Sequence, residues 1–129
     1  MKKTAKRHHP LYDRLAGIVG EKYVSDEEFV LSTYNTYDTS CNPPGPVLGI
    51  VVIPGSTDEV SEIVKLANAT KTSIVPRGGG ASIKGYVAGE PGRSINMDMI
   101  RMNRIIELDT DSKFVTAEAG IIYGALGQQ

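Results

Sequence analysis

The sequence predicts an α+β (mixed α/β) fold, in which helices flank a small sheet of parallel and antiparallel strands. A continuous apolar run, Gly49–Ile53, is followed by a segment with helical spacing and then by a second apolar run, Ser73–Val75. This order predicts two parallel strands joined by a right-handed helical crossover. Two later runs, Arg104–Leu108 and Phe114–Glu118, are separated by turn-forming residues, which predicts an antiparallel hairpin that closes the sheet.

The composition is that of one globular domain: 129 residues, 40% of them hydrophobic and 22% charged. Fourteen basic and fifteen acidic side chains give a formal charge of -1, so we expect no nucleic-acid partner. The longest apolar run, Ile50–Ile53, is far shorter than the roughly 20 residues that span a bilayer, so we expect no transmembrane segment. Cys41 is the only cysteine, which excludes an intrachain disulfide, and we predict no metal site. These features favour the cytoplasm.

Residues 1–46 are predicted to hold a basic tail, two short helices and a linker. Apolar side chains at helical spacing predict the first helix over Pro10–Val19. Ser25 stands three residues before Glu28, the spacing of a capping box, which predicts a second helix through Leu31. We expect the two helices to pack together as an N-terminal cap. The proline-rich stretch that follows them, residues 38–46, predicts the linker.

Residues 47–129 are predicted to form one subdomain that is incomplete at its C-terminal end. Ser56 or Thr57 is predicted to cap the helix between the first two strands. In Ser94–Met99 apolar residues alternate with polar ones, which predicts another strand. The apolar segment Ile121–Leu126 begins a further helix, and a short helix with an apolar face needs more protein to pack against.

Three consecutive glycines, Gly78–Gly80, follow the second predicted strand, in the sequence "IVPRGGGASIKG". Three glycines lose much backbone entropy on folding, so a turn with positive φ or a close approach of another group must require them. The loop lacks the helix of a Rossmann fingerprint and the Gly-Lys-Ser/Thr of a Walker loop. Two interpretations remain: a turn at the sheet edge, or a nest of N–H groups from Gly78 to Ala81 that binds an anion, with the Ser82 hydroxyl as a further donor.

Arg77, immediately before the glycines, has two roles open to it. Its guanidinium could donate charge-assisted hydrogen bonds to an anion in the loop. It could equally form a salt bridge with a carboxylate such as Asp98 or Glu118.

Four segments occur in a recognisable order: "VVIPGSTDEVSEIVKLANAT", "IVPRGGGAS", "NMDMIRMNRIIELD" and "VTAEAGIIYGAL". With them the chain resembles the first FAD-binding subdomain of the FAD-linked oxidases of the vanillyl-alcohol oxidase type. The resemblance is closest to the glycolate oxidase and D-lactate dehydrogenase branch, and it covers the chain from about Leu11 to Leu126. The fold implied is the first subdomain of that FAD-binding domain.

The resemblance implies that the glycine loop wraps the pyrophosphate of FAD. The cofactor-binding residues implied are Pro76, Arg77, Gly78, Gly79, Gly80, Ala81, Ser82 and Gly85. The family often has threonine where Ala81 stands, so this chain lacks one hydroxyl donor. The family also often has a second glycine near the position of Tyr86, so some flexibility of the loop is lost. Some relatives attach FAD covalently through a histidine near this loop, but no histidine follows His9, so we expect noncovalent FAD.

The resemblance also implies a flavin-dependent oxidoreductase that acts on an α-hydroxy acid of the glycolate or D-lactate type. In that family the flavin and substrate are held by later segments, so this chain carries the phosphate end, and we assign no catalytic residue. We expect the chain alone to be inactive and to need a completing chain or a missing C-terminal region. A homo-oligomer is left open. The alternative is a noncatalytic nucleotide-binding or interaction domain left by truncation.

Overall fold

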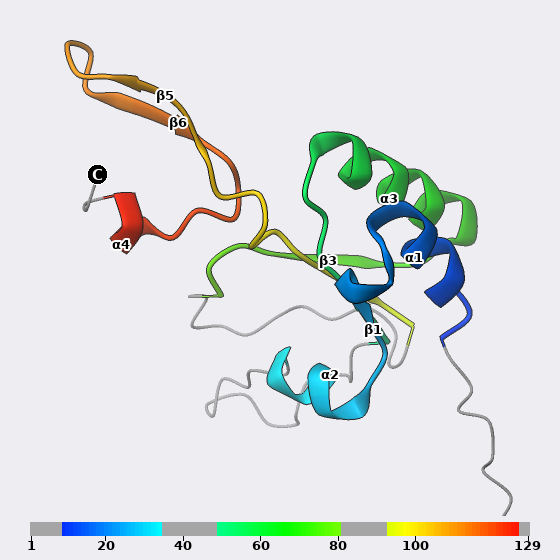
Figure 1. The fold of residues 1–129 in the computed structure, drawn as a ribbon. Helices are drawn as coiled ribbons and strands as arrows, with labels where there is room; N and C mark the ends of the chain where they lie inside the picture. The colour runs from blue at the N-terminus through cyan, green and yellow to red at the C-terminus, as the bar shows by residue number, and fades with distance from the viewer. Residues whose placement is uncertain (1–8, 35–48, 81–92, 127–129) are drawn as a thin grey trace, which may run out of the picture.

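The computed structural model describes residues 9–34, 49–80 and 93–126, whose helices and strands are drawn in Figure 1. In chain order the elements are α1 (Tyr12–Val19), the 3-10 helix η1 (Glu21–Tyr23), β1 (Val24–Ser25), α2 (Glu28–Tyr34), β2 (Ile50–Val52), α3 (Thr57–Thr70), β3 (Ile74–Arg77), β4 (Ile95–Asp98), β5 (Ile105–Asp109), β6 (Phe114–Ala117) and α4 (Tyr123–Leu126). The predicted linker and Cys41 lie outside the described residues. No helix in the described ranges is long and apolar enough to span a membrane.

The main sheet has four strands in the order β1-β2-β4-β3. Strands β2 and β3 both run parallel to β4, whereas β1 pairs antiparallel with β2. The parallel arrangement of the strands on either side of α3 confirms the predicted unit. The strand predicted third along the chain, β4, lies between the other two, and in register Asn96 is opposite both Val51 and Val75.

One face of this sheet carries the larger hydrophobic core. Ile50 and Val52 of β2 and Ile95 and Met97 of β4 pack there with buried residues of α1 and α3, among them Leu15. Figure 1 shows α1 and α3 on this side of the sheet. Because successive strand residues point to opposite faces, the residues between these belong to the other side.

The opposite face is covered by α2, which Figure 1 shows across the sheet from α1 and α3. Leu31 of α2 packs with Val51 and Val75 in a second, smaller core. Burial on both faces explains why β2 is a continuous apolar run. The prediction that the first two helices pack together is wrong, because each covers a different face of the sheet.

Of the two serine caps predicted at helix N-termini, only the one at Ser56 is present. At α3 the Ser56 hydroxyl accepts from the Glu59 N–H at 3.2 Å, and the Glu59 carboxylate accepts from the Gly55 N–H at 2.7 Å. This is the predicted Ser56 cap. At α2 the Ser25 hydroxyl accepts from the N–H of Glu27, not of Glu28, so the predicted capping box is wrong although the helix forms.

Strands β5 and β6 form a two-stranded sheet of their own. The prediction that this hairpin closes the main sheet is therefore wrong. It extends away from the main sheet in Figure 1, and Ile106, Leu108, Phe114 and Val115 expose apolar side chains. A salt bridge fastens its base, where the Arg104 guanidinium lies 2.6 Å from the Glu118 carboxylate. The hydrogen bonds between β5 and β6 form within the hairpin, and neither strand pairs with a strand of the main sheet.

Candidate phosphate-binding loop

The glycine loop leaves the carboxyl end of β3, which lies beside the carboxyl end of β4. The last bond between these strands joins the Met99 N–H to the Arg77 carbonyl at 2.8 Å. In open sheets with parallel strands, ligands bind outside the carboxyl ends of the strands. Pro76 and Arg77 belong to β3 and Gly78, Gly79 and Gly80 follow it, whereas Ala81, Ser82 and Gly85 lie outside the described residues.

Two of the three glycines have a steric reason within the protein. A Cβ on Gly78 would lie 3.1 Å from the carbonyl oxygen of Ala119, so the segment before α4 lies against this point of the loop. Gly80 has a φ of +72°, and a Cβ there would collide with the guanidinium of Arg77. Glycine is the residue that adopts positive φ without strain.

Gly79 is different, because the described structure leaves space beside it. The nearest heavy atom to a Cβ built on Gly79 is the Cγ1 of Ile122 at 3.9 Å, an ordinary van der Waals distance. Its φ is not among the positive values found for the described glycines. Within the described residues, neither a turn nor a close contact explains a glycine at position 79.

The backbone N–H groups of the three glycines, Gly78, Gly79 and Gly80, have no backbone acceptor among the described residues. Gly78 and Gly79 are also exposed. Consecutive exposed N–H groups make an anion-binding concavity, so the open space at Gly79 fits a phosphate oxygen rather than a side chain.

Of the two roles that the sequence allowed for Arg77, the structure shows the salt bridge. Its guanidinium lies 2.9 Å from the Asp98 carboxylate, directly opposite on β4. The Asp98 side chain is 2% exposed and also accepts from the N–H of Ile100 at 3.0 Å. The guanidinium also lies over the ring of Tyr34, 5.0 Å from its centroid. These contacts fix the Arg77 side chain next to the loop. Glu118, the other carboxylate considered as a partner of Arg77, forms its salt bridge with Arg104 instead.

Two buried polar residues, one just before β4 and one within it, were missed in the sequence analysis. Ser94 and Asn96 are fully buried on the same face as Asp98, and among the described residues the Ser94 hydroxyl and both polar atoms of the Asn96 amide have no hydrogen-bond partner. The alternation of polar and apolar residues in this strand was the available signal. It indicated a strand with one exposed face, whereas both faces of β4 are buried.

Comparison with known proteins gives the class of this domain. A family model described as "FAD binding domain" matches residues 49–129, which is more than half of the chain. The chain therefore belongs to this family of FAD-binding domains, which occurs in FAD-linked oxidoreductases, and FAD is the cofactor.

Several curated relatives match the chain in sequence. An uncharacterized FAD-linked oxidoreductase of Escherichia coli, YgcU, is 32% identical over 118 residues, covering 86% of this chain and 24% of the relative. The mitochondrial D-lactate dehydrogenase (cytochrome) of Arabidopsis thaliana is 37% identical over 87 residues, covering 67% of this chain and 14% of that protein. The chain thus spans about a quarter or less of these relatives.

Solved structures confirm the predicted fold. p-Cresol methylhydroxylase superposes with a TM-score of 0.80 at 21% identity, covering 91% of this chain and 23% of that one. An alkyldihydroxyacetonephosphate synthase superposes with a TM-score of 0.76 at 23% identity, covering 98% of this chain and 25% of the other. The mixed α+β arrangement is therefore that of the vanillyl-alcohol oxidase type of FAD-binding domain, as the resemblance in sequence implied.

Proposed function

We propose that the loop after β3 holds the pyrophosphate of FAD through its backbone N–H groups. The observation that carries this proposal is Gly79, whose missing side chain leaves open space beside N–H groups that no described carbonyl accepts. Gly78 and Gly80 shape the loop, while Pro76 and Arg77 anchor it to the sheet. Ala81, Ser82 and Gly85, which the family resemblance adds, complete the proposed site.

In this proposal Arg77 positions the loop and does not contact the diphosphate. Its guanidinium is held by Asp98 at 2.9 Å and stands against Gly80, where a larger residue would collide with it. A fixed cation beneath the loop adds positive potential to that of the N–H groups without forming a direct ion pair. FAD is bound noncovalently in this proposal, since the glycine loop itself contains no histidine.

We further propose that the whole protein oxidises an α-hydroxy acid. The names of several relatives support this class, namely the D-lactate dehydrogenase, the D-2-hydroxyglutarate dehydrogenase of Escherichia coli and the glycolate oxidase subunit GlcD of Bacillus subtilis. When bound, FAD supplies the hydride acceptor for such an oxidation. The residues that hold the isoalloxazine and substrate belong to other protein, a completing chain or further sequence, and the chain alone is inactive.

Calorimetric titration of the chain with FAD, ADP and FMN tests the phosphate-loop proposal. FAD and ADP share the diphosphate and should bind, whereas FMN, with one phosphate, should bind more weakly. Gly79→Val should abolish binding of both dinucleotide and ADP, because the added side chain fills the space of a phosphate oxygen. Unchanged ADP affinity in this variant would contradict the nest. The substrate class is tested on the completed protein, where flavin uptake without turnover of glycolate or D-lactate would leave only the substrate class wrong.

A further inference from the structure

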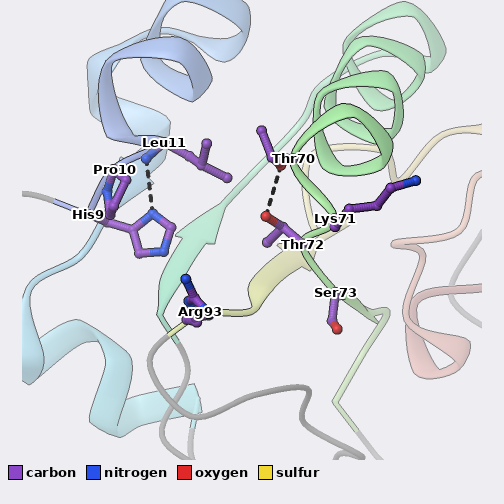
Figure 2. A pocket seen from close by; sticks show the side chains of 8 residues that line it. All are labelled: His9, Pro10, Leu11, Thr70, Lys71, Thr72, Ser73 and Arg93. Carbon is purple, nitrogen blue, oxygen red and sulfur yellow. Dashed lines mark hydrogen bonds between the residues drawn. The ribbon is translucent and has the colours of Figure 1, made fainter.

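A cavity lies at the opposite end of the parallel strands from the glycine loop. It has a volume of about 650 Å³ and is lined by residues before α1, by the turn between α3 and β3, and by Arg93. Figure 2 shows these three segments around it. The turn and Arg93 directly precede β3 and β4, so the cavity is at the amino ends of the strands whose carboxyl ends carry the loop. Its size is in the range of small-molecule sites.

The charges around the cavity are positive. Lys71 and Arg93 are among its lining residues, together with His9, and none of the described lining residues is acidic. The Asp26 carboxylate accepts from the backbone N–H of His9 at 2.6 Å. An anionic ligand is therefore favoured electrostatically.

The imidazole of His9 presents a donor. Its Nδ1 accepts a hydrogen bond from the Leu11 N–H at 3.2 Å, so in the neutral ring the proton is on Nε2. Figure 2 shows the second ring nitrogen on the cavity side, near Arg93. The imidazole N–H and the guanidinium thus lie on one side of the cavity, as the two donors needed to bind a phosphate or carboxylate group.

The facing wall presents an acceptor. The Thr70 hydroxyl donates to the Leu66 carbonyl at 2.9 Å, which uses its proton. The Thr70 and Thr72 hydroxyl oxygens are 2.8 Å apart, so the proton of this bond comes from Thr72. In this arrangement the Thr72 oxygen retains a lone pair that can accept a hydrogen bond from a ligand hydroxyl.

We propose that this cavity binds a small organic anion, a phosphate or carboxylate that also carries a hydroxyl group. The anionic group contacts His9 and Arg93, and the ligand hydroxyl donates to Thr72. Lys71, whose side chain is exposed and extends away from His9 in Figure 2, adds long-range attraction only. The site is independent of the FAD-phosphate loop, because the two lie at opposite ends of the parallel strands.

Titration of the isotope-labelled chain with glycerol 3-phosphate and with glycerate, followed by amide NMR, tests the site. Either ligand should shift the amides of residues 9–11 and 70–73 and leave those of Gly78–Gly80 unchanged. The ligand with the lower Kd identifies the preferred anionic group. Potassium chloride at equal ionic strength is the control for nonspecific ion effects. Shifts confined to the glycine loop, or no saturable shift with either ligand, would overturn the proposal.

Substitutions of single lining residues measure the contribution of each proposed contact to ligand affinity. Arg93→Gln should weaken binding about tenfold, and His9→Asn should weaken it several-fold, because asparagine can still accept from the Leu11 N–H but lacks the imidazole donor. Thr72→Val should weaken binding of both ligands while inorganic phosphate is unaffected. Unchanged affinity in Arg93→Gln, with the fold intact by its amide spectrum, would contradict the site.

Lys113 provides a matched control for the substitution of Lys71, the lysine that lines the cavity. Lys71 and Lys113 both adopt left-handed backbone conformations, with φ of 54° and 57°. Lys71→Gln should weaken binding slightly, whereas Lys113→Gln, on the hairpin turn, should not change it. Equal effects of the two substitutions would show a response to net charge alone and would overturn the cavity assignment.

Discussion

Arg77 and Asp98 face each other at the carboxyl ends of two adjacent parallel strands, with 2.9 Å between guanidinium and carboxylate. Their environments differ, since the Arg77 side chain is 24% exposed and that of Asp98 only 2%. The pair lies directly before the glycine loop, and the arginine also touches Gly80. It therefore connects the interior of the sheet to the proposed cofactor site.

This asymmetry predicts unequal costs for removing the two partners. Arg77→Met leaves a buried carboxylate without its cation and should lower the free energy of unfolding by about 2–4 kcal/mol. Asp98→Asn leaves a guanidinium that can reach water and should cost about 1–2 kcal/mol. Urea unfolding of both variants measures the difference. A larger loss for Asp98→Asn than for Arg77→Met would contradict this ranking of the two partners.

Among the described glycines outside the loop, Gly120 is predicted to be the most sensitive to substitution. Its N–H donates to the Met102 carbonyl at 2.8 Å, and an added Cβ would overlap the carbonyl of Met99. Because both neighbours are backbone atoms, they cannot rotate away, and Gly120→Ala should destabilise the fold by roughly 1–3 kcal/mol or more. Gly124→Ala is the control, since nothing lies within 4 Å of its added Cβ. Equal melting temperatures of the two variants would refute this packing.

The separate hairpin predicts a contrast between two leucines. Leu108 is 65% exposed on β5, whereas Leu15 of α1 is fully buried. Leu108→Ser should change the free energy of unfolding by less than about 0.5 kcal/mol, as for other surface substitutions. Leu15→Ala should cost about 2–5 kcal/mol. Denaturant unfolding checks both, and a large loss from Leu108→Ser would mean that other protein covers the hairpin in solution.

His9 predicts a pH dependence of stability. Burial lowers the pKa of the imidazole below 6.5, although the nearby Asp26 carboxylate acts in the opposite direction. The unfolded chain therefore binds the proton more readily, so stability should fall as the pH drops below about 6.5. His9→Asn should flatten this part of the curve. Urea midpoints between pH 7.5 and pH 5.5 measure the slope, and identical slopes for both proteins would remove His9 as the cause.

Local patterns predicted many of the elements because their causes are local. The apolar run at β2, the Ser56 cap of α3 and the turn residues after Asp109 each specify an element through a few neighbouring side chains. Asp109 does accept from the N–H groups of Asp111 and Ser112, both at 2.9 Å, as a turn aspartate should. Pairing between distant segments was less predictable. The residue pattern of Arg104–Glu118 predicts a hairpin but does not indicate whether the hairpin pairs with the main sheet.

The sequence by itself determined the glycine loop, its place after a buried strand and the family to which the domain belongs, because these depend on residue type and order along the chain. The tertiary structure decided that β4 lies between β2 and β3, that Arg77 pairs with Asp98, and that Gly79 alone of the three described loop glycines stands beside open space. Each of these depends on which distant residues become neighbours. Such contacts are set by the packing of the whole sheet, which no short stretch of sequence encodes.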